Sequence, residues 1–262
     1  MGISHEKELE LAQQVQDHTR PRNVPELPGY MIFARTIPAT WGNGDFYDMI
    51  GVRPRESDRG YVLDLNPTVE HLVVSMGDAT GHGMGSALMA TAFTAMLRVS
   101  IRLGVYHRDL VDALNAQLRE DLPDGHFITL LLGRLDCTRH MFRWVSFGQG
   151  PLWLYQNRTR KIEPLEPHHP PLGVLRSMLG YKPTETFLEP GDTILAISDG
   201  FHETMSRGEE LIGEQKLMET FRTVAGSDPE HIFQTLWDCL KNHAEGLPQG
   251  DDRTFLLIRR LK

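Results

Sequence analysis

The sequence predicts an α+β domain in which antiparallel strands and helices form separate layers. Segments rich in aromatic and β-branched residues, broken by Gly, Pro or Asn, follow one another quickly, which is typical of strands. Longer segments with apolar residues at helical spacing come next, and this order of strands before helices occurs twice. A strict alternation of strands and helices would instead indicate a doubly wound parallel sheet.

The first half of the chain begins with a predicted helix over residues 4–18, where Leu9, Ala12 and Val15 form a narrow apolar stripe. This helix either packs on the edge of the domain or contacts a partner or an upstream sensor as a coiled coil. We expect an antiparallel meander of four strands at residues 30–37, 45–52, 60–65 and 71–76. Helices that cover the sheet are predicted at residues 85–103 and 108–121.

The second half repeats this order. Strands are predicted at residues 127–135, 141–146, 152–156, 181–188 and 193–198. Helices follow at residues 211–224 and 229–243, and a last strand covers residues 254–260. No linker, low-complexity tract or internal repeat divides the 262 residues, which favours a single domain.

Composition excludes several classes of partner. The formal charge of −8, from 35 acidic and 27 basic residues, provides no basic surface for nucleic acid or for an anionic membrane. Cys137 and Cys239 are far apart and lack zinc-ligand spacing, so we expect reduced thiols. The apolar runs are shorter than the roughly 18 residues that span a bilayer. We therefore expect a soluble cytoplasmic protein that binds neither nucleic acid nor membrane.

Four acidic motifs with neighbouring glycines lie far apart in the chain. They are GDFYD at residues 44–48, MGDATGHG at 76–83, SDG at 198–200 and GDD at 250–252. Taken singly, such Asp and Gly pairs are ordinary turn formers. However, Asp78 and Asp199 each follow an apolar strand, where a solvent turn alone needs no carboxylate. The motifs together predict one site with four carboxylates: Asp45, Asp78, Asp199 and Asp251.

Clustered carboxylates indicate a particular chemistry. With no Cys among them, they suit Mg²⁺ or Mn²⁺ better than zinc or copper. Carboxylates held close together repel one another unless cations lie between them. Two cations roughly 3.5 to 4 Å apart can activate a bridging water and bind a phosphoryl oxygen. Such a site hydrolyses a phosphoester without a protein nucleophile.

Six motifs in order carry a family resemblance. WGNGDFYD, VVSMGDATGHGMGSALMA, FITLLLGRLD, PPLG, PGDTILAISDGFHET and GDDRTFLLI resemble the SpoIIE/RsbU branch of the metal-dependent (PPM, type 2C) serine/threonine protein phosphatases. The resemblance covers about residues 9–260. It implies an α-β-β-α layered phosphatase fold, in which two antiparallel sheets pack face to face and are flanked by helices. It also implies an N-terminal linker helix at residues 1–24 and a phosphatase domain at residues 25–262.

The resemblance also implies the roles of single residues. By matching motif, Asp78 bridges two Mn²⁺ or Mg²⁺ ions, and the carbonyl of Ala79 is a further ligand. Asp199 and Asp251 complete the metal shell, and Asp45 binds the second ion directly or through water. The implied catalytic residues are Asp78, Asp199 and Asp251. No organic cofactor is implied.

Other positions are less closely tied to the family pattern. Asp48 and Asp252 are candidates for the outer part of the site. Asn43 stands where relatives usually have the first Gly of a GGD motif. Gln149 and Gly150 stand where relatives usually have a His-Asn pair.

The implied activity is the hydrolysis of phosphoserine or phosphothreonine on a regulatory protein by a water that two metal ions activate. The implied substrate is a phosphorylated STAS-domain anti-sigma-factor antagonist in a partner-switching pathway. The N-terminal helix is the expected contact for a homodimer or a sensor. A non-catalytic module with the same fold, which binds a phosphoprotein or passes on a signal, is the alternative.

Overall fold

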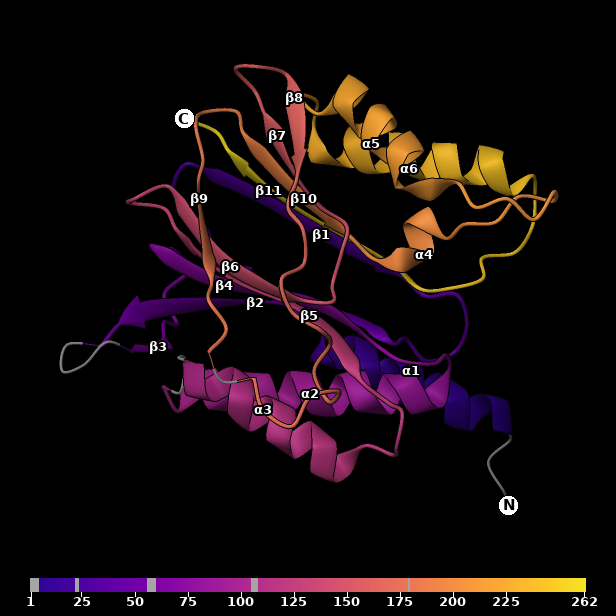
Figure 1. Ribbon diagram of the computed structural model, residues 1–262, viewed down its shortest axis with the longest axis horizontal. Helices are drawn as coiled ribbons and strands as arrows, with labels where there is room; N and C mark the ends of the chain where they lie inside the picture. Colours follow the sequence, from indigo (N-terminus) through magenta and orange to yellow (C-terminus); the bar gives the residue numbers. More distant parts are fainter. Residues whose placement is uncertain (1–4, 22–23, 56–59, 105–107, 179) are drawn as a thin grey trace. The chain divides into compact units, whose positions relative to one another are not determined.

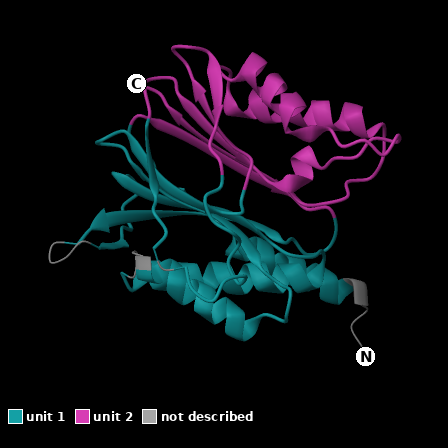
Figure 2. Cartoon of the chain, in the orientation of Figure 1, with its two compact units in different colours: residues 1–28, 40–149, 167–187 teal, residues 29–39, 150–166, 188–262 magenta. Residues whose placement is uncertain are grey.

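The chain forms two compact units, each assembled from several segments (Figure 1). A computed structural model describes residues 5–21, 24–55, 60–104, 108–178 and 180–262. Unit 1 comprises residues 1–28, 40–149 and 167–187, and unit 2 comprises residues 29–39, 150–166 and 188–262 (Figure 2). The predicted single domain and its boundary after residue 24 stay predictions. Of the predicted linker helix at 1–24, residues 1–4, 22 and 23 lie outside the described residues.

Unit 1 contains a six-stranded antiparallel sheet in the order β3-β2-β4-β5-β6-β9 (Figure 1). Its strands are β2 (Asp45–Pro54), β3 (Tyr61–Leu63), β4 (His71–Ala79), β5 (Ile128–Asp136), β6 (Met141–Phe147) and β9 (Thr184–Phe187). Its helices are α1 (His5–Thr19), α2 (Met84–Arg102) and α3 (Arg108–Asp121). Helix α2 contacts β2, β3 and β4, and it also packs against α1 and α3.

The core of unit 1 lies between this sheet and the helices α2 and α3. Leu130 and Leu132 share one face of β5, because alternate residues of a strand point the same way. Both are buried in one cluster with Phe93 and Leu97 of α2. Within the described residues, α2 is the one helix long and apolar enough to cross a membrane. The complete burial of Phe93 and Leu97 identifies it as a core helix of unit 1.

Unit 2 contains a five-stranded antiparallel sheet in the order β1-β11-β10-β7-β8. Its strands are β1 (Tyr30–Ile37), β7 (Leu152–Gln156), β8 (Lys161–Pro164), β10 (Thr193–Ile197) and β11 (Arg253–Arg260). Its helices are α4 (Asp199–His202), α5 (Gly213–Val224) and α6 (Pro229–Ala244). Leu195 of β10 and Phe255 of β11 are buried in one cluster with Phe221 of α5 and Leu236 of α6.

The predicted α+β class, with two antiparallel sheets and accompanying helices, is confirmed. The predicted meander of the first four strands is wrong, because β1 pairs with the last strand, β11, and not with β2. The strand predicted to end at residue 76 continues to Ala79, because Gly77 to Ala79 pair with β5. Of the residues predicted as a strand at 181–188, only Thr184–Phe187 form one, which is β9. Strand β8 and the short helix α4 were not predicted.

Candidate metal centre

The first pair of predicted ligands lies on neighbouring strands of unit 1. Asp45 begins β2, and the antiparallel register places it directly opposite Asp78 of β4. One carboxylate oxygen of Asp45 and one of Asp78 lie within 4.8 Å of each other. Asp45 is only 3% exposed, and Asp78 is half-buried. Like charges directly opposite each other on neighbouring strands are destabilising, so this arrangement favours a nearby cation.

Two glycines leave the space that this pair needs. A Cβ on Gly44 would lie 2.7 Å from Oδ1 of Asp78 and 3.0 Å from the carbonyl oxygen of Ala79. A Cβ on Gly77 would lie 2.1 Å from the carbonyl oxygen of Thr129. The Ala79 N–H donates to the carbonyl of Gly44 at 3.2 Å. The backbone therefore approaches the Asp78 carboxylate more closely than any side chain would permit.

Asn43 and helix α1 stabilise the turn before Asp45. Asn43 Oδ1 accepts a hydrogen bond from the Asp45 N–H at 2.9 Å. Gln16 of α1 bonds both backbone groups of Asn43: its Oε1 accepts from the Asn43 N–H at 2.9 Å, and its Nε2 donates to the Asn43 carbonyl at 2.5 Å. Gln13 Oε1 accepts from the Gly42 N–H at 3.0 Å. The N-terminal helix is thus bonded directly to the loop that carries Asp45.

A hydrogen-bond chain from β5 holds the backbone of Asp78. The Asp78 N–H donates to Oγ1 of Thr129 at 3.0 Å, and this hydroxyl donates to Oε1 of Gln149 at 2.7 Å. Gln149 is 5% exposed. The residue that departs from the family pattern therefore supports Asp78 through Thr129. Sequence analysis did not identify Thr129, because a threonine in a strand carries no signal of its own.

The second pair of predicted ligands lies in unit 2. Asp199 follows β10 as the first residue of α4, and Asp251 lies two residues before β11. Burial raises the pKa of the Asp199 carboxyl, and the nearby charges of Asp251 and Glu203 raise this pKa further. A Cβ on Gly200 would lie 2.1 Å from the carbonyl oxygen of Asp252. The turn after Asp199 therefore packs directly on the backbone that follows Asp251.

The two outer candidates hold the scaffold together. The carboxylate of Asp48 forms two hydrogen bonds with Arg98 of α2, one of them from Nη2 to Oδ1 at 3.0 Å. Asp252 Oδ1 accepts from the Ala39 N–H at 2.8 Å and so ties the segment after β1 to the start of β11. Asp45 and Asp48 are three residues apart on β2, so they point to opposite faces of the sheet. Asp48 therefore binds a core helix.

The donors fit a hard divalent cation. Carboxylate oxygens and a backbone carbonyl are the ligands that Mg²⁺ and Mn²⁺ prefer. A cation near Asp45 and Asp78 would relieve the repulsion between them. A cation near Asp199 would favour the ionised form of this carboxyl, whose pKa is raised. The structure thus places Asp45, Asp78 and Ala79 together in unit 1, and Asp199 and Asp251 together in unit 2. Their roles as ligands stay predictions.

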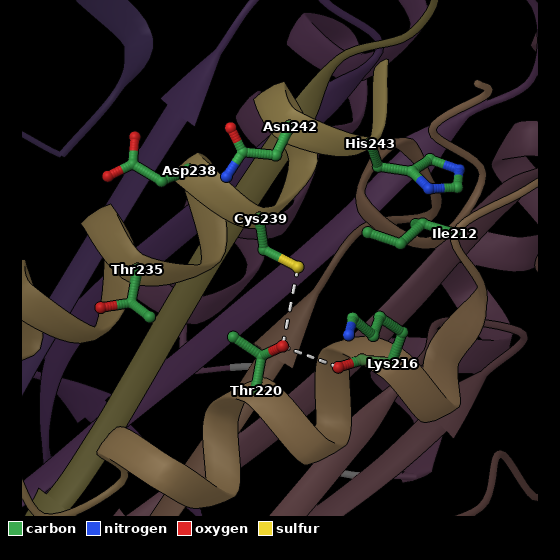
Figure 3. A pocket seen from close by; sticks show the side chains of 8 residues that line it. All are labelled: Ile212, Lys216, Thr220, Thr235, Asp238, Cys239, Asn242 and His243. Carbon is green, nitrogen blue, oxygen red and sulfur yellow. Dashed lines mark hydrogen bonds between the residues drawn. The ribbon is translucent and has the colours of Figure 1, made fainter. Parts of the chain in front are cut away.

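A separate cavity of about 620 Å³ lies between α5 and α6 of unit 2 (Figure 3). Thr220, on its wall, donates to the carbonyl of Lys216 at 2.8 Å, and its Oγ1 lies 3.6 Å from Sγ of Cys239. The ring of His243 bonds the carbonyl of Glu210 at 2.9 Å. These polar groups of the wall are satisfied by their neighbours, and none of the predicted metal ligands lines the cavity.

Comparison with solved structures shows that this chain has the PP2C-type phosphatase fold. The SiaA-PP2C domain of Pseudomonas aeruginosa matches with a TM-score of 0.73 and 19% identity, over 97% of this chain and 95% of that chain. The RsbU and RsbW domains of Rv1364c from Mycobacterium tuberculosis match with a TM-score of 0.71 and 24% identity, over 93% of this chain and 63% of that chain.

The chain belongs to the family described as Stage II sporulation protein E (SpoIIE), whose profile matches residues 68–261. The phosphoserine phosphatase RsbU of Bacillus subtilis (strain 168) is 25% identical, and the match covers 99% of this chain and 72% of that protein. The family resemblance of the six motifs is thus confirmed.

Thr129→Val should destabilise the fold, because it keeps the shape of the side chain but removes the hydroxyl. The Asp78 N–H and Oε1 of Gln149 would each lose a partner, at a cost of about 1–3 kcal/mol per buried group. Thr129→Ser keeps the hydroxyl and should lose less than about 1 kcal/mol, the value of one buried methyl group. Urea unfolding of both variants measures the difference, and equal free energies of unfolding would contradict this role of Thr129.

Asp199→Asn should stabilise the metal-free protein at pH 7. The raised pKa of Asp199 means that the folded protein holds this proton more tightly than the unfolded chain does. The proton on Asp199 stabilises the folded protein at any pH below the pKa that this carboxyl has in the unfolded chain. This stabilisation is lost as the pH rises through the pKa of Asp199 in the folded protein. Removal of the charge should therefore raise the melting temperature at pH 7 by roughly 2–4 °C, which corresponds to about 1 kcal/mol.

Thermal unfolding in EDTA, followed by circular dichroism, measures this shift. The advantage of Asp199→Asn over the parent should shrink as the pH is lowered towards about 4, near the ordinary pKa of an aspartate, where the parent carboxyl is also neutral. A variant that melts at or below the parent temperature at pH 7 would show that the native environment does not disfavour this charge.

Proposed function

We propose that this protein is a metal-dependent protein serine/threonine phosphatase that hydrolyses phosphoserine or phosphothreonine on a regulatory protein. The observation that carries the proposal is the opposition of Asp45 and Asp78 across β2 and β4 in a chain of the SpoIIE family. A fold that holds two carboxylates against their repulsion gains stability from a bound cation. Phosphomonoester hydrolysis is a reaction that bound cations promote.

In this proposal, Asp78 would be a ligand shared by two Mn²⁺ or Mg²⁺ ions. Asp45, the carbonyl of Ala79, Asp199 and Asp251 provide the remaining protein ligands. The ions, when bound, supply the activation of the attacking water and neutralise charge on the phosphoryl group. The protein contributes the positions of the oxygen donors, which Gly44 and its neighbours fix in unit 1. It needs no nucleophilic side chain, so the phosphoryl group is not transferred to the protein.

The proposed substrate is a phosphorylated STAS-domain anti-sigma-factor antagonist. Two facts support it: the resemblance to the SpoIIE/RsbU branch, and the 25% identity with a protein named as a phosphoserine phosphatase. The net charge of −8 is consistent with a protein partner and not with nucleic acid or an anionic membrane. In this proposal the enzyme acts in the cytoplasm, within a partner-switching pathway.

Helix α1 is the proposed contact for a second copy or for a sensor. Leu11 and Val15, four residues apart on α1, are 58% and 56% exposed and form an apolar stripe. On the same helix, Gln13 and Gln16 hydrogen-bond the loop before Asp45. A partner that binds the apolar stripe would therefore act on a helix that is already bonded to the loop of a proposed ligand.

Asp78→Asn and Asp199→Asn should each abolish manganese-dependent hydrolysis of a phosphoserine protein. We expect losses of more than about 100-fold, because removal of a metal ligand should exceed the 10- to 100-fold effect of changing a residue behind the ligands. Asp238→Asn is the control, since this aspartate of α6 pairs with Lys241 at 2.7 Å on the surface. Phosphate release at saturating Mn²⁺ measures the effect. Turnover within threefold of the parent in either ligand variant, with the fold intact, would rule out the proposed site.

Calorimetric titration with Mn²⁺ separates the phosphatase from a non-catalytic phosphoprotein-binding module. The phosphatase should bind Mn²⁺ below millimolar concentration, and release phosphate faster from a phosphorylated STAS-domain protein than from free phosphoserine. A protein that binds phosphoprotein but takes up no Mn²⁺ at millimolar concentration would instead be the module. Preference for free phosphoserine would indicate a hydrolase of small phosphoesters.

A further inference from the structure

Strand β11 carries two buried arginines, Arg253 and Arg259, which are 6% and 8% exposed. Burial lowers the pKa of both guanidinium groups, so each charge is held in the fold at a cost. A buried charge is tolerated where hydrogen bonds replace its lost hydration. The partners of these two arginines therefore indicate what each one contributes.

Arg253 bonds the turn that follows Asp199. Its Nε donates to the carbonyl of Gly200 at 2.9 Å, and its Nη2 donates to Oγ1 of Thr204 at 2.9 Å. The guanidinium carbon also lies 5.1 Å from the ring centre of Trp237 in α6. Gly200 is the residue next to Asp199, and Arg253 is two residues after Asp251. One side chain thus joins the two segments that carry the proposed ligands of unit 2.

The turn needs such a support. Helix α4 has four residues, and a helix of this length is not stable alone, because its hydrogen bonds do not offset the cost of nucleation. Asp251 acts on the Asp199 carboxyl with like charge, which pushes the turn away from the Asp251 segment. Glu203, at the end of α4, adds a like charge within the turn itself. The bonds from Arg253 to Gly200 and Thr204 oppose this repulsion. The guanidinium also interacts electrostatically with Asp251, whose charge acts against the effect of burial on the pKa of Arg253.

We propose that Arg253 is a positioning residue, which holds the Gly200 to Thr204 turn on β11 and so keeps Asp199 at the separation from Asp251 that a divalent ion needs. This inference rests on the proposed function, because it takes both aspartates as metal ligands. In this proposal Arg253 is not itself a metal ligand. Its proposed effect on metal binding is exerted through the bonds to Gly200 and Thr204, and Arg253→Lys, which keeps the positive charge near Asp251, separates this effect from the loss of that charge.

Arg259 provides a matched control on the same strand. Its Nε donates to Oγ1 of Thr193 at 2.9 Å, its Nη1 donates to the carbonyl of Ser227 at 2.6 Å, and its Nη2 donates to the carbonyl of Ala225. Like Arg253, it is a buried arginine that donates to a threonine hydroxyl and to backbone carbonyl groups. However, Arg259 lies six residues further along β11, which is about 20 Å in an extended strand. Its loss should weaken the fold but leave Asp199 in place.

The test uses the full chain with Arg253→Met, Arg253→Lys and Arg259→Met. Native-state amide exchange in EDTA reports on the turn through the Phe201 and Glu203 amides, which donate to Ser198 and Asp199. Calorimetry with Mn²⁺ alone reports on the ligands. For Arg253→Met, which loses both bonds, we expect at least about tenfold faster exchange at these amides and at least about tenfold weaker Mn²⁺ binding, since one lost bond from a charged donor alone corresponds to about tenfold. Arg259→Met should change neither by more than about twofold.

Arg253→Lys keeps the charge but makes only one of the two bonds, so it should fall between the parent and Arg253→Met. It also carries the comparison if Arg253→Met does not fold. Equal Mn²⁺ affinities for the Arg253 and Arg259 variants would overturn the proposal. Faster exchange with unchanged Mn²⁺ affinity would also overturn it, because Arg253 would then stabilise the turn without positioning Asp199 for the ion. A parent protein that binds no Mn²⁺ would instead refute the proposed function. The exchange data would then show only whether Arg253 holds the turn after Asp199.

Discussion

The register between β2 and β4 is the constraint on which the candidate site depends, because it sets the carboxylates of Asp45 and Asp78 side by side. The pairing runs from Asp45 opposite Asp78 to Val52 opposite His71. A slip of one residue would turn every side chain of β2 to the other face of the sheet. It would remove Phe46 from the core cluster of unit 1, in which this ring is buried. The hydrophobic core therefore fixes the positions of two like charges that would otherwise separate.

In both units a glycine lets two segments that carry proposed ligands approach each other closely. Gly44 lies against Oδ1 of Asp78 in unit 1, and Gly200, next to Asp199, lies against the carbonyl of Asp252 in unit 2. In each case a side chain on the glycine would force the two segments apart. The glycines in the acidic motifs therefore do more than permit turns. They allow the backbone to lie against the Asp78 carboxylate in unit 1 and let the turn after Asp199 lie against the segment after Asp251 in unit 2.

The sequence predicted those residues of the site that a local sequence pattern identifies. An apolar run followed by aspartate and glycine identified Asp78 and Asp199, because a buried strand that ends in a carboxylate is a local feature. The pairing of β1 with β11 has no local signal, since Tyr30 meets Arg260 from the other end of the chain. The motif GDFYD did not separate Asp45 from Asp48 either. Only the contact of Asp48 with Arg98 of α2 assigns that aspartate to the scaffold.

The residues that the sequence missed act through the backbone, which explains why no motif reveals them. Thr129 accepts from the Asp78 N–H, Gln16 bonds the backbone of Asn43, and Arg253 donates to the carbonyl of Gly200. Such a contact depends on which backbone segment the fold brings next to the side chain, and the side chains of that segment do not determine it. These hydrogen bonds of Thr129, Gln16 and Arg253 do not involve the carboxylate oxygens of the proposed ligands. An arginine paired directly with Asp199 would stabilise the metal-free fold, but it would compete with the ion for the same oxygens.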